Sequence, residues 1–341
     1  IHKSYHGGWC YLKKGMENKI LHNGLTADVN SLYPSVMHSE SCSIYPFGRP
    51  TFWSGNYIPD EALEPNRYYF IRIKCKFDIK PKHLPCIQLK GNYLYRQNEW
   101  LEHSDIRNEE GKLVRYVDNN GNIVDSRVTM TLTMTDYELI KDHYTLTDME
   151  ILDGCWFKAK SAIFDDYIDY YKKIKIESKG AARTLAKLFL NNLYGKMAAS
   201  KNSSFKVGIV KEDGSLGFFT VPEYNKKAGY IAVGSAITSY ARNFTIRTAQ
   251  KNYDYFVYAD TDSIHCICEP EQLVGVPVHP TDFCHWKLES YWDEAIFVRQ
   301  KTYIEHVTHE DQEPIEQPYF NVKCAGMPEK CKQLFIRSME H

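Results

Sequence analysis

The sequence predicts an α+β protein, in which antiparallel strand pairs and helices occupy separate stretches of the chain. Three observations support this class. Residues 46–150 are polar and rich in β-prone runs, the pattern becomes helical from residue 164 to about residue 200, and residues 255–268 form a strand–turn–strand pattern. Together these stretches predict strand hairpins beside a separate helical part.

Within residues 46–150, we expect strands at Tyr68–Phe77 and Arg127–Met134, and Asn120-Gly121 is a strong signal for a hairpin turn. Residues 205–257 are expected to return to mixed structure. After Cys268 we expect a polar tail. The sequence shows neither an internal repeat nor a low-complexity tract.

The composition indicates a soluble, cored protein of two or three domains. The 341 residues include 42 Lys and Arg against 43 Asp and Glu, a formal net charge of -1, and 43% hydrophobic residues. These values exclude a mostly disordered chain and a uniformly basic nucleic-acid binder, although they leave room for a local basic face. No run approaches the roughly 18 consecutive apolar residues of a membrane-spanning helix.

The cysteines and the first residue bear on the origin of the chain. Ten scattered cysteines without a C-x-x-C pair favour reduced thiols in a cytosol over disulfides or a zinc finger. Because the chain begins at Ile1, without an initiator Met or a signal peptide, we expect it to be part of a longer protein.

The first segment that indicates chemistry is D-V-N-S-L-Y-P-S at residues 28–35. Pro34 suits the first turn of a helix, so we expect a strand at Leu25–Val29 that runs into a turn and then a helix. This places the Asp28 carboxylate at a strand end, beside backbone amides that can hold phosphate oxygens. On its own, an Asp before a helix is more often a cap.

The second segment is Y-A-D-T-D-S at residues 258–263, which is predicted to be a hairpin with Asp260 and Asp262 at its tip. A solvated turn is the ordinary explanation of such a tip. The flanking runs are strongly apolar, however, and a buried hairpin needs a positive charge near its acids, which a divalent cation would supply. His265 is expected to be a strand residue rather than a metal ligand.

The third segment, from Tyr171 to Lys201, holds eight Lys or Arg residues and a single acid, Glu177. Five of its polar positions, 175, 179, 183, 187 and 191, are spaced by four, and a continuous helix would align them unless Gly180 divides it into two. Like charges at this spacing repel, and a solvated face usually intersperses Glu. A polyanion therefore explains this segment better than solvent alone.

Together the three segments predict a phosphoryl-transfer site. Asp28 and Asp262 could share two divalent ions, one activating a hydroxyl and the other stabilising the leaving oxygen of an in-line displacement. The basic helix, which ends in Asn191, Tyr194 and Gly195, would clamp a triphosphate and offer an aromatic face to a base.

In this order and at this separation, the segments resemble the polymerase motifs of family B DNA polymerases. Residues 28–35 resemble the first motif, K-L-F-L-N-N-L-Y-G at 187–195 the second, and Y-A-D-T-D-S the third. Two further segments resemble the protein-primed branch found in small tailed phages and linear plasmids. These are Tyr5-His6-Gly7-Gly8, similar to its Y-x-G-G signature, and Lys301-Thr302-Tyr303, similar to its K-x-Y motif. Asn192 departs from the Ser usual in the second motif.

The resemblance implies a role for each matching residue. Asp28 and Asp262 would hold two Mg²⁺ ions together with the Val29 carbonyl, and Mn²⁺ would substitute for Mg²⁺. Asp260 and Lys187 would be the other catalytic residues. Tyr33 would be a steric gate against ribonucleotides. The residues implied to bind the nucleotide are Leu32, Tyr33, Lys175, Lys187, Asn191 and Tyr194. Those implied to face DNA are Tyr5, Gly7, Gly8, Ser31, Arg299, Lys301 and Tyr303.

The resemblance also implies a right-hand fold with an antiparallel palm sheet, helical fingers, two insertions and a truncated thumb. The palm would comprise 1–45, 151–170 and 229–325, and the fingers 171–201. The insertions, similar to the two terminal-protein regions of the branch, would be 46–150 and 202–228, and the thumb would start at 326–341. Only 27 residues precede Asp28, so we expect a fragment without the exonuclease domain of the family.

The partners implied by the resemblance are primer–template DNA, dNTPs and a terminal protein primer, with no membrane. The chain is expected to be a monomer in the cytoplasm, which is the bacterial host cytosol for a phage protein. Two other hypotheses stay open. One is a non-catalytic module that binds DNA or terminal protein. The other is a two-metal nuclease or phosphohydrolase, which would leave the basic segment and Tyr33 unexplained.

Overall fold

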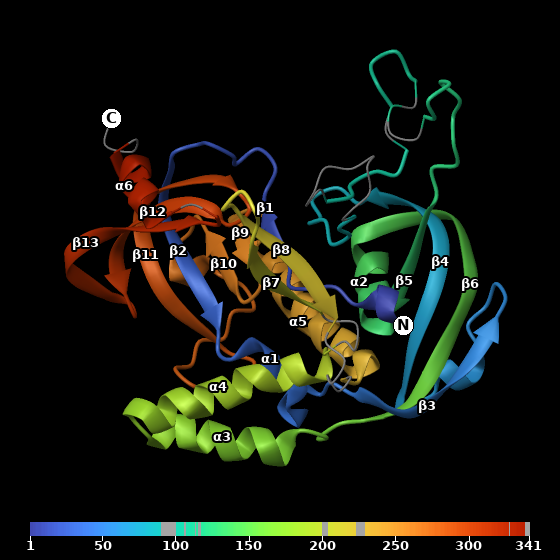
Figure 1. The fold of residues 1–341 in the computed structure, drawn as a ribbon, viewed down its shortest axis with the longest axis horizontal. Coiled ribbons are helices and arrows are strands. Elements are labelled where there is room, and N and C mark those ends of the chain that lie inside the picture. The colour runs from blue at the N-terminus through green and yellow to red at the C-terminus, as the bar shows by residue number, and fades with distance from the viewer. Residues whose placement is uncertain are drawn as a thin grey trace.

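The computed structural model describes residues 1–89, 100–105, 107–112, 114, 117–199, 204–222, 229–326 and 328–337. It contains a seven-stranded sheet, a four-stranded sheet and a two-stranded hairpin, with helices packed between and beside them (Figure 1). All strand pairs within these sheets are antiparallel. The predicted α+β class is therefore confirmed. Within these described ranges, no helix is long and apolar enough to cross a membrane.

The seven-stranded sheet carries both predicted acidic segments. Its order is β1-β9-β10-β2-β11-β12-β13. The strands are β1 (Cys10–Leu12), β2 (Leu21–Val29), β9 (Phe256–Asp260), β10 (Ser263–Cys266), β11 (Trp286–Arg299), β12 (Thr302–Glu310) and β13 (Glu313–Cys324). The predicted strand before Asp28 and the predicted hairpin around Asp260 and Asp262 are both present.

The polar tail expected after Cys268 is wrong, because this stretch contains β11, β12 and β13, three long strands of the same sheet. In β11, the buried residues Trp286 and Leu288 alternate with the exposed Lys287 and Glu289. A strand with one buried face has a polar composition, and its period of two is what identifies it.

The sheet curls, so that strands far apart in its order face each other. Although β10, β2 and β11 lie between β9 and β12 in the order, the ring of Tyr258 on β9 lies 5.2 Å from the ring of Tyr303 on β12. The backbone N–H of Lys301 donates a hydrogen bond to the Tyr258 hydroxyl at 2.9 Å. The curl thereby brings the turn before β12 next to the acidic hairpin.

The four-stranded sheet lies at the other end of the molecule, in the order β3-β6-β4-β5, with helix α2 against it (Figure 1). Its elements are β3 (Tyr45–Ser54), β4 (Arg67–Ile79), β5 (Val128–Thr133), α2 (Met134–His143) and β6 (Tyr144–Lys160). The strands predicted at Tyr68–Phe77 and Arg127–Met134 correspond to β4 and β5. At Asn120-Gly121 the turn forms, and the described residues around it contribute one bridge, between Val117 and Ile123.

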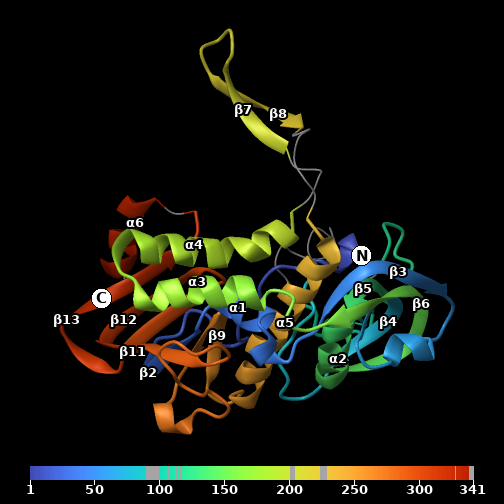
Figure 2. The ribbon, with the colours of Figure 1, turned by 90° about the horizontal axis from the view of Figure 1, so that it is seen from below.

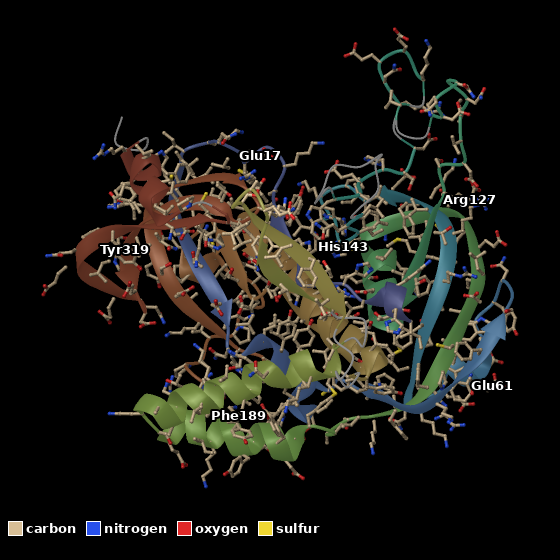
Figure 3. All side chains as sticks on the ribbon, in the orientation of Figure 1. Glu17, Glu61, Arg127, His143, Phe189 and Tyr319 are labelled. Carbon is tan, nitrogen blue, oxygen red and sulfur yellow. The ribbon has the colours of Figure 1, made fainter. Side chains whose placement is uncertain are left out.

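The basic segment forms two helices, α3 (Asp165–Glu177) and α4 (Gly180–Met197), rather than one. Gly180 begins α4 with a φ of +65°, a backbone conformation that glycine adopts without strain and that a continuous helix excludes. Helices α3 and α4 lie side by side beside the short helix α1 (Leu32–Met37), and Phe189 marks this pair in Figure 3. Lys201, the last residue of that segment, lies outside the described residues.

The stretch expected to be mixed at 205–257 has two distinct parts. The hairpin of β7 (Ser204–Val210) and β8 (Leu216–Pro222) stands away from the body of the molecule (Figure 2). Helix α5 (Ile231–Lys251) is 21 residues long and is buried over most of its surface between the two large sheets. Because its buried residues include many Ser, Thr, Ala and Gly, the sequence lacks the one-sided apolar stripe that predicts a helix. Near the C-terminus, α6 (Glu329–Arg337) follows β13.

Candidate functional site

Strands β2 and β10 bring Asp28 and Asp262 together. Asp28 lies directly opposite Ser263 in the pairing of these strands, and the backbone N–H of Val29 donates to the carbonyl oxygen of Asp262 at 2.8 Å. At the hairpin tip, Thr261 has a φ of +58°, and the N–H of Asp262 donates to the carbonyl of Asp260 at 2.7 Å. The sequence therefore folds into a tight turn that presents the Asp262 carboxylate beside Asp28.

The two carboxylates share an electrostatic environment that favours a bound cation. Burial, together with the negative charges of Asp262 and Glu289, raises the pKa of Asp28 to about 8. Burial and the charge of Asp260 likewise raise the pKa of Asp262. Both shifts show that the ionised carboxylates lack sufficient positive charge around them. A divalent cation would supply it.

Across the described ranges, no cluster of three or more His, Cys, Asp or Glu forms a ready-made metal site. Mg²⁺ is usually held by one or two carboxylates and takes its other ligands from water and substrate phosphates. His265 lies buried on β10 and shares a 2.5 Å hydrogen bond with Glu305. It is therefore a strand residue, as expected, and its buried side chain lines the inner part of a cavity of about 930 Å³ that also reaches Asp28 and Asp262.

Helices α3 and α4 place the basic residues across a cavity from the carboxylates. This cavity, which we call the nucleotide cavity, has a volume of about 490 Å³. It is lined by residues of all three predicted segments, among them Asp28, Val29, Ser31, Leu32, Tyr33, Lys175, Arg183, Lys187, Asn191 and Asp262. The Lys175 ammonium donates to the Ser31 hydroxyl at 2.9 Å. Burial and the like charges of Lys187 and Arg183 lower the pKa of Lys175, which shows how concentrated positive charge is here.

Three tyrosines are in contact beside this region, and of these Tyr33 lines the nucleotide cavity. The rings of Tyr33, in the first turn of α1, and Tyr194, on α4, stack with their centroids 4.4 Å apart. The Tyr194 hydroxyl is hydrogen-bonded to the hydroxyl of Tyr5. One face of the Tyr194 ring is therefore covered by Tyr33 in this arrangement, so that base stacking on Tyr194 would use its other face or require the pair to separate.

Most of the residues predicted to face DNA lie around the acidic hairpin, whereas Ser31 lines the nucleotide cavity. Gly7, Gly8, Arg299 and Lys301 line a cavity of about 660 Å³ together with Asp260. Lys301 and Tyr303 also line a larger cavity of about 930 Å³, which reaches Asp28 and Asp262. Tyr5, Gly7 and Gly8 line a smaller one of about 180 Å³. Two of these cavities reach the acidic hairpin, whereas the one lined by Tyr5 lies beside Asp136 and Arg242.

Comparison with known proteins agrees with this geometry. The sequence profile of the family described as DNA polymerase type B, organellar and viral, matches residues 1–272. The chain belongs to this family of DNA polymerases.

Its relatives include the DNA polymerase of Bacillus phage phi29, 36% identical over 98% of this chain and 55% of the relative. The DNA polymerase of Streptococcus phage Cp-1 is 34% identical over 90% of this chain and 49% of the relative. The solved structure of phi29 DNA polymerase with primer–template DNA and incoming nucleotide matches with a TM-score of 0.82 and 35% identity, over 98% of this chain and 55% of that one. This type B chain spans about half the length of the curated relatives it matches.

Two charged residues of this type B polymerase chain support the site without being evident from the sequence. Arg242, on α5, forms a buried ion pair with Asp136 of α2, with 2.7 Å between Nη2 and Oδ2. Its Nη1 donates to the backbone carbonyls of His6 and Gly7 at 2.6 and 2.8 Å, which holds the Y-x-G-G loop in place. A basic residue in a helix gives no sequence signal of burial, so only the tertiary contacts reveal this role.

Lys287 and Glu289 were also missed, although both line the 930 Å³ cavity beside Asp28. Their alternation with Trp286 and Leu288 could have shown that they share the polar face of a strand. The sequence contains no signal that β11 pairs with β2.

Proposed function

We propose that this chain carries the polymerising site of a template-directed DNA polymerase, which transfers a nucleotide from a dNTP to a primer 3′-hydroxyl or to a terminal-protein hydroxyl. The observation that supports this most directly is the nucleotide cavity. It joins carboxylates and basic residues from three segments of the chain, with Asp28 and Asp262 opposite Lys175, Lys187 and Asn191. Phosphoryl transfer mainly requires positioning and charge neutralisation, and this cavity offers both.

Asp28 and Asp262 would hold the Mg²⁺ ions, with the Val29 carbonyl as a further ligand and Mn²⁺ as a substitute. The pKa of Asp28 is raised first by burial and then by the charges of Asp262 and Glu289, and a cation beside the carboxylate would stabilise its ionised form against both effects. When bound, the metal ions supply Lewis-acid activation of the attacking hydroxyl and charge stabilisation of the leaving pyrophosphate.

The chain's own residues would position the reactants. Lys175 and Lys187 would bind the triphosphate as point charges, and Asn191 and Tyr194 would line the nascent base pair. Leu32 and Tyr33 would hold the nucleotide from the first turn of α1, with the Tyr33 ring excluding a 2′-hydroxyl. The primer hydroxyl would lose its proton to water, and its oxygen would attack the α-phosphorus to form the new phosphodiester bond. The bond between the α-phosphorus and the oxygen that bridges to the β-phosphorus would break, and pyrophosphate would leave with that oxygen and the electron pair.

The DNA strands would lie on the cavities around the acidic hairpin. Ser31, Arg299, Lys301 and Tyr303 would face the primer strand, and the loop with Tyr5, Gly7 and Gly8 the template. The polymerase of phage phi29, to which this chain is similar, has been solved with primer–template DNA and incoming nucleotides. That complex supports the same classes of partner here.

We also propose the division of the chain that the family resemblance implies. The palm is 1–45, 151–170 and 229–325, the fingers are 171–201, the insertions are 46–150 and 202–228, and the thumb begins at 326–341. A terminal protein as primer, a monomeric chain and a location in the host cytoplasm belong to the same proposal.

Primer extension by the 341-residue chain with Mg²⁺ and dNTPs tests this function. Because a metal-binding carboxylate contributes several kcal/mol to the transition state, Asp262→Asn should reduce the extension rate at least about 100-fold. Asp293→Asn is the matched control, since Asp293 is an exposed acid of the same sheet that pairs with His306. Binding of primer–template without extension would contradict the proposal and indicate a binding module. Hydrolysis of DNA without dNTPs would indicate a nuclease.

A further inference from the structure

Lys287 is the nearest basic neighbour of Asp28 along the sheet. Strand β11 pairs antiparallel with β2, and Lys287 lies directly opposite Asp28 in that pairing. Residues that face each other across an antiparallel pair project from the same side of the sheet, with their Cβ atoms about 5 Å apart. The two side chains therefore emerge side by side, on the face where Glu289 also lies.

This side chain reaches the nucleotide cavity from the opposite wall to the other basic residues. Five basic residues line that cavity against two acids, Asp28 and Asp262. Four of the five come from α3 and α4, and the fifth is Lys287 on the sheet. A phosphate group in this cavity would therefore have positively charged side chains on both sides. The basic residues that line the cavity also outnumber the acidic ones.

The present partner of Lys287 is exchangeable. Its ammonium lies 2.9 Å from Oδ1 of Asp311, in the turn between β12 and β13, and the side chains are 49% and 65% exposed. An exposed ion pair of this kind contributes little to stability. A phosphate group can replace the carboxylate, because the flexible four-carbon stem lets the ammonium move.

We propose that Lys287 is a phosphate-binding residue that contacts the triphosphate of the incoming nucleotide from the sheet side of the nucleotide cavity. The inference rests on the proposed function, which supplies the nucleotide, and adds a residue that none of the motifs contains. Asp311 holds the ammonium in the absence of nucleotide and releases it when the triphosphate binds.

Isothermal titration of the 341-residue chain with Mg²⁺-dATP, and separately with inorganic tripolyphosphate in Mg²⁺, tests the contact without relying on catalysis. A hydrogen bond to a charged group corresponds to about a tenfold change in affinity. Lys287→Ala should therefore raise the Kd of both ligands by about tenfold, and Lys287→Arg should keep it near the unaltered value. Lys287→Met, which retains the apolar stem, replaces the Ala variant if that variant unfolds.

Asp311→Asn separates phosphate binding from a purely structural ion pair. It frees the ammonium, so the Kd should be unchanged or lower. If Lys287 acted only through its ion pair with Asp311, Lys287→Ala and Asp311→Asn would instead change the Kd by the same factor. Lys14→Ala is the matched control, because Lys14 also forms an exposed ion pair, with Glu102 at 3.3 Å, and lines none of the cavities described above.

Three results would overturn the inference. These are equal effects of Lys287→Ala and Asp311→Asn on the Kd, an unchanged Kd in Lys287→Ala, and failure of the unaltered chain to bind tripolyphosphate. Failure of the proposed function looks different. In that case the chain binds tripolyphosphate through Lys287 but extends no primer.

Discussion

The ammonium of Lys301 lies 3.2 Å from both carboxylate oxygens of Asp260, although 41 positions separate the two residues in the chain. Lys301 adopts a φ of +59° in the turn before β12, which only the curl of the sheet brings to the acidic hairpin. Asp260 therefore pairs with the K-x-Y turn, while Asp262, two residues on, faces Asp28. Neighbouring acids in one motif have different partners.

This difference predicts unequal effects of two similar substitutions. Asp260→Asn should lower the extension rate by about tenfold, because it removes one ion pair, whereas Asp262→Asn should lower it at least about 100-fold. Lys301→Ala should lower the extension rate by the same factor as Asp260→Asn. The variant with both substitutions should lower the rate no further than either one alone, as expected for two residues that act through one ion pair. Steady-state extension kinetics measure this. Equal losses at Asp260 and Asp262 would refute the distinction.

The raised pKa of Asp28 predicts how stability depends on pH. The folded state holds the Asp28 proton with a pKa of about 8, against about 3.9 for an unfolded Asp. The contribution of Asp28 to the free energy of unfolding is therefore greatest below about pH 4 and is lost as the pH rises to about 8. Mg²⁺ binds the ionised form, so it should raise the Tm more at about pH 9 than at about pH 6. Asp28→Asn should remove both effects, and an unchanged pH slope in that variant would contradict the assignment.

Gly8 should resist substitution because of its contact with the hairpin tip. A Cβ at this position would lie 2.5 Å from Oγ1 and 2.8 Å from Cγ2 of Thr261. Gly8→Ala should therefore destabilise the fold by about 1–3 kcal/mol and slow extension, since it displaces the residue between the two acids. Adding Thr261→Gly removes the clash and suits the φ of +58° at that residue, so the double variant should recover stability. Denaturant unfolding checks the rescue, and a double variant no more stable than Gly8→Ala would exclude the clash as the cause.

The buried pair of Asp136 and Arg242 predicts a large loss of stability. Their side chains are 9% and 7% exposed. Asp136→Ala should destabilise the protein by about 3–5 kcal/mol, because it leaves a buried guanidinium without its partner. Asp142→Ala is the control, since Asp142 forms an exposed pair with Arg247 at 2.8 Å and should cost at most about 1 kcal/mol. Urea denaturation measures the free energy of unfolding of both variants. An equal loss in Asp136→Ala and Asp142→Ala would show that burial does not strengthen the pair of Asp136 and Arg242.

Tyr33 should control the choice of sugar. Its ring lines the nucleotide cavity from the first turn of α1 and is held by stacking on Tyr194. Tyr33→Val removes the ring and should admit ribonucleotides, whereas Tyr33→Phe keeps the ring and should still exclude them. The ratio of kcat/KM for dATP and ATP measures the discrimination. The same ratio in the Val variant and the unaltered chain would exclude the gate.

Much of the candidate site could be predicted because its parts are local. The strand before Asp28, the helix near Pro34 and the hairpin at Asp260 and Asp262 all follow from short patterns of apolar residues and turn chemistry. The long helix α5 could not be predicted in the same way. Its buried Ser, Thr and Ala residues make contacts all round, so no stripe marks it.

The sequence by itself determined the chemistry of this protein, since the carboxylates, lysines and tyrosines of the site lie in short motifs whose local conformation is set by neighbouring residues. Only the tertiary structure decided which of them meet. The pairing of Lys287 with Asp28, the contact of Lys301 with Asp260 and the burial of Arg242 against Asp136 join strands and helices that are distant in the chain. Such contacts depend on strand order and on the curl of the sheet, which arise from packing the whole core and not from any local pattern.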